Sequence, residues 1–361
     1  MHKSYNKDLR KLTFSEAIRE GIDQSMADDP NLIVIGEGVP DPKSIFMTTS
    51  GLIEKYGDKR VFDMPLSENG MTGVCIGAAL NGTHVLMIHQ RIDFAMLAMD
   101  QIINNAAKWH YMFNGQSSVP IVIRVIVGRG WGQGPQHSQN LQAIFAHIPG
   151  LKVVTPATAK DAKGMMIAAL KDKNPVIFIE HRWLHHIEDA VPEEMYPSDL
   201  DKAQIIRSGS DVTIVANSLM TIETMKAAKV LSEVGIDVEI VDLRSIKPID
   251  LDTIIKSVSK TKNLIVVDSA WKTGGISGEI ISLVIESSFD LLDKAPLRIT
   301  SPDHFVPTSH YQADGYYQDA KQIAEQVLDF FDQQDGIDII NKKFKIDGPV
   351  DVPNREFHGP F

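Results

Sequence analysis

This sequence has one cysteine, no long apolar run and no excess of positive charge, and each of these features excludes a class of protein. The single cysteine, Cys75, cannot form an internal disulfide, so a disulfide-stapled secreted scaffold is excluded and a reducing compartment is expected. No run of about 18 apolar residues occurs, so no membrane-spanning helix is expected. The net charge of −11 comes without a dense patch of lysine and arginine, which argues against a nucleic-acid surface.

The N-terminal stretch MHKSYNKDLRK also lacks the apolar core of a secretory signal. We therefore expect the protein in the cytoplasm. Cys75 falls among apolar residues of a helix-like segment, which predicts a packing role for the thiol rather than a catalytic one.

The chain is long enough for two domains, each with its own core. It has 361 residues, of which 43% are hydrophobic and 23% charged, the composition of a soluble globular protein. An irregular, acidic, proline-bearing stretch, EDAVPEEMYPSDLDK, is typical of a domain linker. The expected units are a first domain, a linker, a second domain and a partly extended tail, at residues 1–190, 191–209, 210–335 and 336–361.

Short apolar strands alternate with amphipathic helices along both domains. The predicted strands include NLIVIGE, THVLMI, VPIVIRVIV, LKVVTP and NPVIFIE in the first domain, and DVTIVAN, DVEIVDL, NLIVVDS and LRIT in the second. Thr13 with Glu16 and Thr158 with Asp161 mark two helix starts, and another helix is predicted over residues 94–110. Near-continuous apolar strands separated by helices predict an α/β fold with a parallel sheet covered on both faces.

The acidic residue Glu68 is the first candidate for chemistry. It lies in FDMPLSENGMTGVCIGAAL, between a strand-like run that ends at Met64 and a small, apolar helix-like segment from Met71 to Leu80. A carboxylate there would be largely removed from water, which disfavours its charged form and prepares it to hold or release a proton. The alternative is an acid that starts a helix after Ser67, because the helix dipole favours anions at that end. The segment alone favours this alternative.

A glycine-rich loop at the end of a strand carries the second candidate, His137. In VIVGRGWGQGPQHSQ the glycines alternate over positions 128 to 134 and lead to His137 and Ser138. Glycines let a backbone approach a ligand closely, and open α/β sheets bind ligands at the carboxyl ends of their strands. Histidine titrates near neutral pH and suits proton transfer. The spacing departs from GxGxxG and no P-loop lysine follows, so a dinucleotide site is a weak interpretation.

The segment HQRIDFAMLAMDQIINNAAKWHYM holds further candidates. Phe94 lies at the start of a predicted helix, so it is either a core residue or an aromatic platform for a ligand. His89 and Arg91 follow a strand, where they could meet a substrate anion, although a solvated loop is the favoured interpretation. His181 and His185 in EHRWLHH have helical spacing, but no HExxH glutamate or cysteine accompanies them, so they do not predict a metal site.

Together these segments resemble the beta subunits of thiamine-diphosphate-dependent 2-oxo acid dehydrogenases, the decarboxylating first component. The motifs that carry the resemblance are LTFSEAIREGID, IVIGEGV, KYGDKRVFDMPLSENGMTG, MDQIINNAAKWHYM, PIVIR, QHSQ, PGLKVVTPATAKDAKGMM, NPVIFIE, DVTIVANS, VDLRSIKPID and VVDSAW. They cover about residues 10–333, and their combination and order are highly specific. The resemblance implies a pyrimidine-binding thiamine domain with a parallel sheet, followed by a transketolase C-terminal α/β domain.

The resemblance also implies roles for single residues. Glu68 falls on the family's glutamate, which hydrogen-bonds N1′ of the aminopyrimidine, and Phe94 falls on the aromatic residue that packs on the pyrimidine ring. His137 falls on the active-site histidine, which steadies the substrate carboxylate or shuttles a proton. Gln90 is expected at the cofactor. A loop for a monovalent cation such as K+, with largely backbone ligands, aligns near Ile121, Ala169, Asp172 and Asn174.

One motif of thiamine enzymes is missing from the chain. These enzymes hold the diphosphate through Mg2+ with a GDG motif, whereas the Gly-Asp pair at residues 57–58 continues here with Lys59. In the resemblance that half of the site belongs to an alpha subunit. The resemblance therefore implies an α2β2 heterotetramer with active sites at α–β interfaces, and a lipoyl-bearing acyltransferase is a candidate further partner.

The sequence also departs from the pyruvate and branched-chain forms. Their strand before the aromatic residue carries neutral or acidic residues where this chain has Ile88, His89 and Arg91, and the glycine-rich loop here bears Arg129 and Trp131. An added cation and imidazole could recognise a phosphate, a sugar or another polar acceptor.

Three functions therefore stay open. The favoured function is decarboxylation of a 2-oxo acid with acyl transfer to lipoamide. The second is a split transketolase-like enzyme that moves a ketol or acyl unit to a sugar or other carbonyl. The third is a non-catalytic regulatory subunit.

Overall fold

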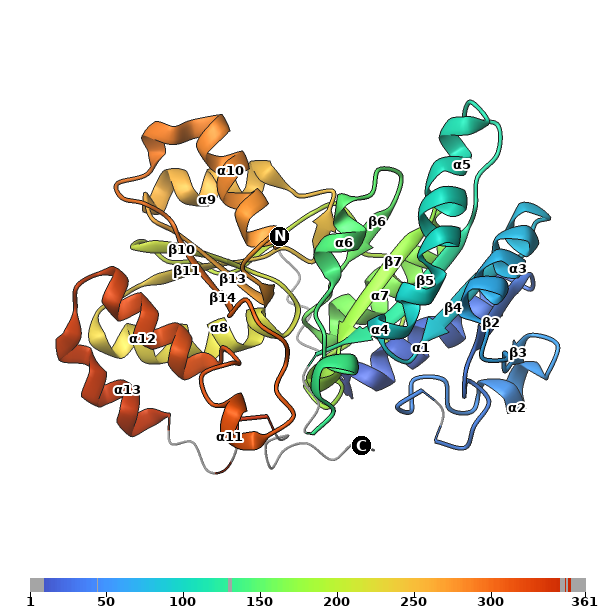
Figure 1. Ribbon diagram of the computed structural model, residues 1–361, viewed down its shortest axis with the longest axis horizontal. Helices are drawn as coiled ribbons and strands as arrows, with labels where there is room; N and C mark the ends of the chain where they lie inside the picture. The colour runs from blue at the N-terminus through green and yellow to red at the C-terminus, as the bar shows by residue number, and fades with distance from the viewer. Residues whose placement is uncertain (1–9, 44, 129–131, 345–347, 349, 352–361) are drawn as a thin grey trace, which may run out of the picture.

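The predicted strands form two large sheets, one in each half of the molecule (Figure 1). The computed structural model describes residues 10–43, 45–128, 132–344, 348 and 350–351. Arg129 and Trp131 lie outside these described residues. No helix in the described part of the chain is long and apolar enough to cross a membrane.

The first sheet has seven strands and carries the candidate catalytic and cofactor-binding residues at its carboxyl edge. In spatial order the strands are β12 (Ser245–Lys247), β6 (Lys152–Val154), β7 (Val176–His181), β5 (Ile121–Val127), β4 (His84–His89), β2 (Leu32–Gly36) and β3 (Val61–Phe62). Neighbouring strands pair in parallel, except that β12 from the second half of the chain runs antiparallel to β6. The predicted parallel α/β sheet is therefore confirmed.

Helices cover both faces of this sheet, because successive side chains of a strand point to opposite sides. Leu86 and Ile88 of β4 pack in one core cluster with α1 (Phe14–Asp28) and α7 (Ala159–Lys171). Val85 and Met87 pack in the other cluster with α3 (Glu68–Leu80) and α6 (Gln142–His147). Cys75 of α3 is buried in this second cluster, and burial raises the pKa of its thiol to about 12. An inert packing role for this cysteine follows.

The local helix signals act as the sequence predicts. Thr13 and Glu16 form a capping box at the start of α1, and the Thr158 side chain accepts a hydrogen bond from the Asp161 backbone N–H at the start of α7. The helix predicted over residues 94–110 is built from several helical turns of different pitch. These are α4 (Ile92–Ala95), a 3-10 turn η1 (Met96–Ala98), a π-helical turn η2 (Gln101–Ala106) and α5 (Ala107–Met112).

The second sheet has five strands and its own helical cover. Its strands are, in spatial order, β14 (Leu297–Ser301), β13 (Leu264–Trp271), β10 (Val212–Ala216), β11 (Val238–Asp242) and β9 (Gln204–Arg207). The helices of this half include α8 (Ser218–Leu231), α9 (Leu251–Thr261), α10 (Ile276–Ser288), α11 (His310–Ala313) and α12 (Ala320–Phe330). The edge strand β9 runs antiparallel to β11 and lies inside the interval 191–209 expected as a linker.

The first part of the expected tail is helical. Residues 337–343 form a helix, α13 (Ile337–Lys343), which packs beside α12 and α8 (Figure 1). Ile340 of this helix is completely buried in the larger core cluster. A short segment with few apolar residues gives little helical periodicity, so the packing partner decides its structure.

Several polar contacts and one strand connect the two halves of the described chain. The Gln142 side-chain amide donates to Asp268 at 2.9 Å, and Arg244 pairs with Asp161 at 3.0 Å. The strand β12 adds an edge to the first sheet. These contacts fix the loop and helix after the glycine-rich segment against the second half.

Candidate active site

Glu68 is a buried acid at the start of α3, not an exposed capping residue. It is the first residue of the helix and its exposed fraction is 9%. Its backbone carbonyl accepts a hydrogen bond from the Thr72 hydroxyl at 2.6 Å. Ser67 precedes the helix but forms no side-chain cap. The burial expected from the sequence is therefore present, and it separates this carboxylate from water.

Two further acids lie beside Glu68 at the edge of the sheet. Glu37 follows β2, and its pKa is raised first by burial and then by the negative charges of Glu68 and Asp63. One carboxylate oxygen of Glu37, Oε1, is buried without a hydrogen-bond partner among the described residues. The side-chain amide of Gln90 donates to the backbone carbonyl of Glu37 at 2.9 Å. Gln90 therefore contacts the acid cluster that Glu37, Asp63 and Glu68 form.

The rings of Phe94 and His137 lie in contact. Their ring centroids are 5.3 Å apart in an edge-to-face arrangement with an interplanar angle of 86°. Asp93, the residue before Phe94, accepts a hydrogen bond from the side-chain amide of Gln139 at 2.6 Å. Burial raises the pKa of Asp93. The start of α4 and the loop after η3 (Gly134–Gln136) are thus joined by both a ring contact and a hydrogen bond.

His89 and Arg91 are buried, so the interpretation of this segment as a solvated loop is wrong. Their exposed fractions are 2% and 6%. Burial lowers the pKa of His89 to about 4, so its imidazole is neutral at physiological pH. Arg91 donates to the side-chain oxygen of Gln133 at 2.5 Å. Gln133 therefore contacts this segment, a contact that the sequence pattern of β4 alone does not reveal.

The residues expected at a monovalent cation lie around the turn between α7 and β7. The Ala169 carbonyl accepts from the Asp172 backbone N–H at 3.1 Å, and the Asn174 backbone N–H donates to the Asp172 carboxylate at 2.9 Å. Lys152 forms an ion pair with the same carboxylate. Ile121 begins β5, whose next residue is in register with the start of β7. The four positions are neighbours, and the cation itself remains a prediction.

The sequence pattern did not indicate Glu37 or a buried charge network that joins β5, β7 and the turn after β7. Arg124 and Glu180 form an ion pair with no exposed side-chain surface, and His185 lies 3.3 Å from the same carboxylate. Burial alone would raise the pKa of Glu180, but the charges of Arg124 and His185 outweigh it and lower the pKa to about 2. Arg182, next to this network, is 4% exposed. The sequence feature that could have indicated these residues is a charged residue directly at the end of an apolar strand.

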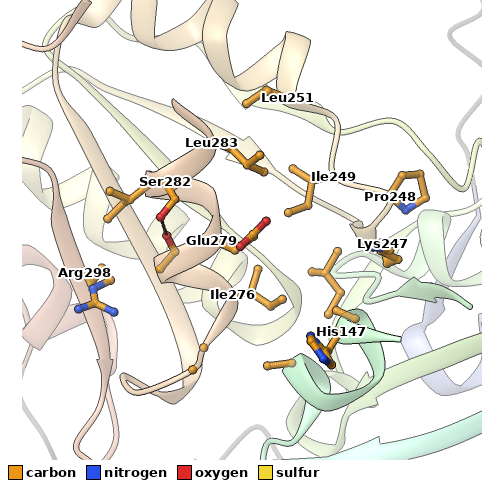
Figure 2. Close-up of a pocket in the computed structure, with 17 residues that line it drawn as sticks. His147, Lys247, Pro248, Ile249, Leu251, Ile276, Glu279, Ser282, Leu283 and Arg298 are labelled. Atoms are coloured by element: carbon orange, nitrogen blue, oxygen red, sulfur yellow. Dashed lines mark hydrogen bonds between the residues drawn. The ribbon is translucent and has the colours of Figure 1, made fainter. Parts of the chain in front are cut away.

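A separate pocket lies away from this cluster, between α6, the segment after β12 and α10. Figure 2 shows this pocket, whose volume is ≈ 890 Å³. Ile249, Ile276 and Leu283 give it an apolar lining, with His147 and Glu279 as polar members. None of the predicted site residues, all of which the structure describes, lines this pocket.

Two family models match this chain, one in each half. They are "Transketolase, pyrimidine binding domain" over residues 10–186 and "Transketolase, C-terminal domain" over residues 201–326. The pyruvate dehydrogenase E1 component subunit beta of Rickettsia felis is 43% identical over 291 residues, which cover 81% of this chain and 89% of that protein. The chain belongs to the beta subunits of thiamine-diphosphate-dependent 2-oxo acid dehydrogenases.

Other similar proteins carry different names at comparable identity. The acetoin:2,6-dichlorophenolindophenol oxidoreductase subunit beta of Cupriavidus necator is 43% identical over 326 residues, covering 87% of this chain and 96% of that protein. A mitochondrial pyruvate dehydrogenase E1 component subunit beta-1 of Arabidopsis thaliana is 41% identical, covering 84% and 85%. A solved split-gene transketolase, described as an inactive beta4 tetramer, has a TM-score of 0.71 at 20% identity and covers 91% and 99%. This last likeness concerns the fold alone.

Proposed function

We propose that this chain is the beta half of a heteromeric enzyme that decarboxylates a 2-oxo acid with thiamine diphosphate and transfers the acyl group to lipoamide. The observation that carries the proposal is the buried Glu68 beside Glu37, with the Phe94 and His137 rings in contact, in a chain of this family. The proposed partner is an alpha subunit in an α2β2 assembly. We expect this assembly in the cytoplasm.

The acid cluster and the aromatic ring fit an aminopyrimidine. A nitrogen heterocycle needs a buried hydrogen-bonding group at its edge and an apolar surface at its face. Glu68 and the unpartnered oxygen of Glu37 meet the first need, and Phe94 meets the second. Thiamine diphosphate, when bound, supplies the electron sink that decarboxylation requires.

The residues of this chain have distinct tasks in the proposal. Glu68 would face the ring nitrogen N1′ of the bound aminopyrimidine and would hold or release a proton there. Gln90 orients the Glu37 backbone through its hydrogen bond. Phe94 positions the pyrimidine ring. His137 binds the substrate carboxylate or moves a proton during acyl transfer, which histidine can do near neutral pH.

The diphosphate side is assigned to the alpha subunit. This sequence has no GDG motif, and no group of three histidine, cysteine, aspartate or glutamate side chains in the described residues could hold a metal ion. We therefore propose that the alpha subunit holds Mg2+ and the diphosphate. A K+ ion near Asp172 and docking of a lipoyl-bearing acyltransferase belong to the same proposal.

The decisive experiment replaces Glu68 in the assembled complex. Glu68→Gln keeps the size of the side chain but cannot exchange the proton, so we expect turnover of pyruvate and branched 2-oxo acids to fall by about 10²- to 10⁴-fold. Reduction of an artificial electron acceptor measures the rate. Glu54→Gln, on the exposed side of α2 (Leu52–Tyr56), is the matched control and should retain the wild-type rate. Unchanged turnover by Glu68→Gln would contradict the cofactor role.

A further inference from the structure

The residues 134–142, which we call the His137 segment, are held from both halves of the molecule. On the side of the first half, the His137 ring contacts the Phe94 ring, and the Gln139 side-chain amide donates to Asp93 at 2.6 Å. The segment ends with the first residue of α6, a helix that lies between the first sheet and the second half (Figure 1). The second half is therefore the neighbour of this segment on its other side.

Two neighbouring side chains of β13 bind the far end of the His137 segment. The Gln142 side-chain amide donates to Asp268 at 2.9 Å, and the Ser269 hydroxyl donates to the Asn140 side-chain oxygen at 3.1 Å. Successive side chains of a regular strand point to opposite faces. The pairing of β13 with β14 shifts between Asp268 and Trp271, and such irregularities change the direction in which side chains point. The irregular end of β13 therefore lets Asp268 and Ser269 reach the same segment.

The near end of the His137 segment meets a third residue of the second half, Thr308. Gly134 is buried with a φ of +60°, and a Cβ at this position would collide with the Thr308 hydroxyl. The same Cβ would lie 3.5 Å from the Thr308 Cβ. Glycine suits both this backbone conformation and this close approach. The second half thus contacts the segment at both of its ends, with His137 between them.

The Gln142–Asp268 pair does not add much stability. The exposed fractions of the two residues are 2% and 1%. Oε1 of Gln142 and Oδ2 of Asp268 are buried without a hydrogen-bond partner among the described residues, and burial raises the pKa of Asp268. Unsatisfied buried polar atoms destabilise a fold, so an apolar pair of similar shape would serve stability at least as well. The polar pair instead supplies direction, because a hydrogen bond restricts the orientation of both side chains.

We propose that Asp268 and Ser269 are positioning residues for His137, so that the second half of the chain sets the orientation of a side chain at the active site of the first half. The inference rests on the proposed function, which gives His137 its task at the substrate. His137 is only half-buried, so its own packing leaves it room to move. A displacement of about 1 Å can lower a reaction rate by about 10²-fold. The loss of one contact from β13 should therefore appear in kcat.

The first test removes the two hydrogen bonds one at a time in the assembled complex. Gln142→Met keeps the length of the side chain, and Ser269→Ala removes only a hydroxyl. We expect each to lower kcat for 2-oxo acid turnover by about tenfold or more, with the affinity for thiamine diphosphate unchanged within about threefold. Gln326→Met on α12 and Ser259→Ala on α9 are the matched controls and should keep the wild-type kcat. A wild-type kcat in both Gln142→Met and Ser269→Ala would overturn the proposal.

Combination with His137→Ala separates positioning from a general structural role. If Ser269 acts through His137, Ser269→Ala should change the residual kcat of His137→Ala by less than about twofold. A structural defect would instead lower kcat by the same factor in both backgrounds, and that result would refute the proposal. Ser269→Ala is used for this cycle because it leaves the buried Gln142–Asp268 pair intact, so the test does not depend on the folding of Gln142→Met.

A chemical readout separates this inference from the proposed function. Diethyl pyrocarbonate acylates accessible imidazole nitrogens, and peptide mass spectrometry measures the rate at His137 in the full chain alone, without turnover. We expect Ser269→Ala and Gln142→Met to raise this rate by about threefold or more, because a segment with fewer contacts opens more often. Ser259→Ala should keep the wild-type rate. A raised rate in a chain whose complex turns over no 2-oxo acid would support the positioning and refute the function. An unchanged rate in both variants would refute the positioning.

Discussion

Asp242 is a buried carboxyl group whose protonation differs between the folded and unfolded states. Asp242 ends β11 and accepts hydrogen bonds from Thr221 at 3.0 Å and from the Arg244 backbone at 3.3 Å, while its Oδ2 is buried without a partner among the described residues. Burial, followed by the negative charge of Asp161, raises the pKa of Asp242 to about 7. The folded state therefore holds a proton that the unfolded chain releases near its ordinary, much lower pKa.

This proton makes stability depend on pH with a defined sign. The contribution of Asp242 is complete at low pH and is lost as pH rises through about 7. Between the ordinary aspartate pKa of about 4 and about pH 7, the free energy of unfolding should fall by about 1.4 kcal/mol per pH unit more in the wild type than in Asp242→Asn, and the difference should level off above about pH 7. Urea unfolding between pH 4 and pH 8 measures the difference. The exposed Asp252→Asn should follow the wild type, and parallel curves for wild type and Asp242→Asn would contradict the assignment.

The sequence indicated part of the candidate site at this scale. Glu68, Phe94 and His137 were candidates because each lies at the border of a predicted element, and the family resemblance implied their roles, which stay predictions. Glu37 and Arg182 were missed, since their importance depends on strands that are neighbours in the sheet but distant in the chain. No local pattern contains that information.

At the scale of elements, α13 tests whether a short helix is held by its packing. Ile340 is completely buried against the larger core, whereas its neighbour Ile339 is 37% exposed. Ile340→Ala should lower the free energy of unfolding by about 2 to 4 kcal/mol, because the change removes buried methyl groups and leaves a cavity. Ile339→Ala is the matched control and should cost much less. Equal losses in urea unfolding would show that α13 is not docked as described.

The elements most readily predicted were those with a strong internal pattern. The apolar runs of β5 and β7 and the capping box of α1 contain enough information to define a strand or a helix start. The helix α13 and the edge strands β9 and β12 depend on partners from other parts of the chain. Tertiary packing therefore determines the secondary structure of the segments that the sequence pattern did not assign.

At the scale of the whole molecule, the helix that carries Glu68 also exposes apolar surface. Val74 of α3 is 60% exposed, and Leu97 of the contacting turn η1 is 64% exposed. Exposed apolar side chains on adjacent elements indicate a protein interface. The proposed function requires a partner close to Glu68, and this surface lies on the helix that carries Glu68.

The proposed assembly can therefore be disrupted from α3 without changing the acid cluster. Val74→Glu places a charge in the expected interface, where desolvation without a counter-ion costs several kcal/mol. We expect binding of the alpha subunit to weaken by at least about tenfold, and light scattering after size-exclusion chromatography should show loss of the heterotetramer mass. Met225→Glu on α8, where the side chain is 44% exposed, is the control and should assemble normally. A Val74→Glu complex of unchanged mass and affinity would show that the alpha subunit does not bind at α3. The residues that hold the diphosphate would then have to come from a partner bound at another surface.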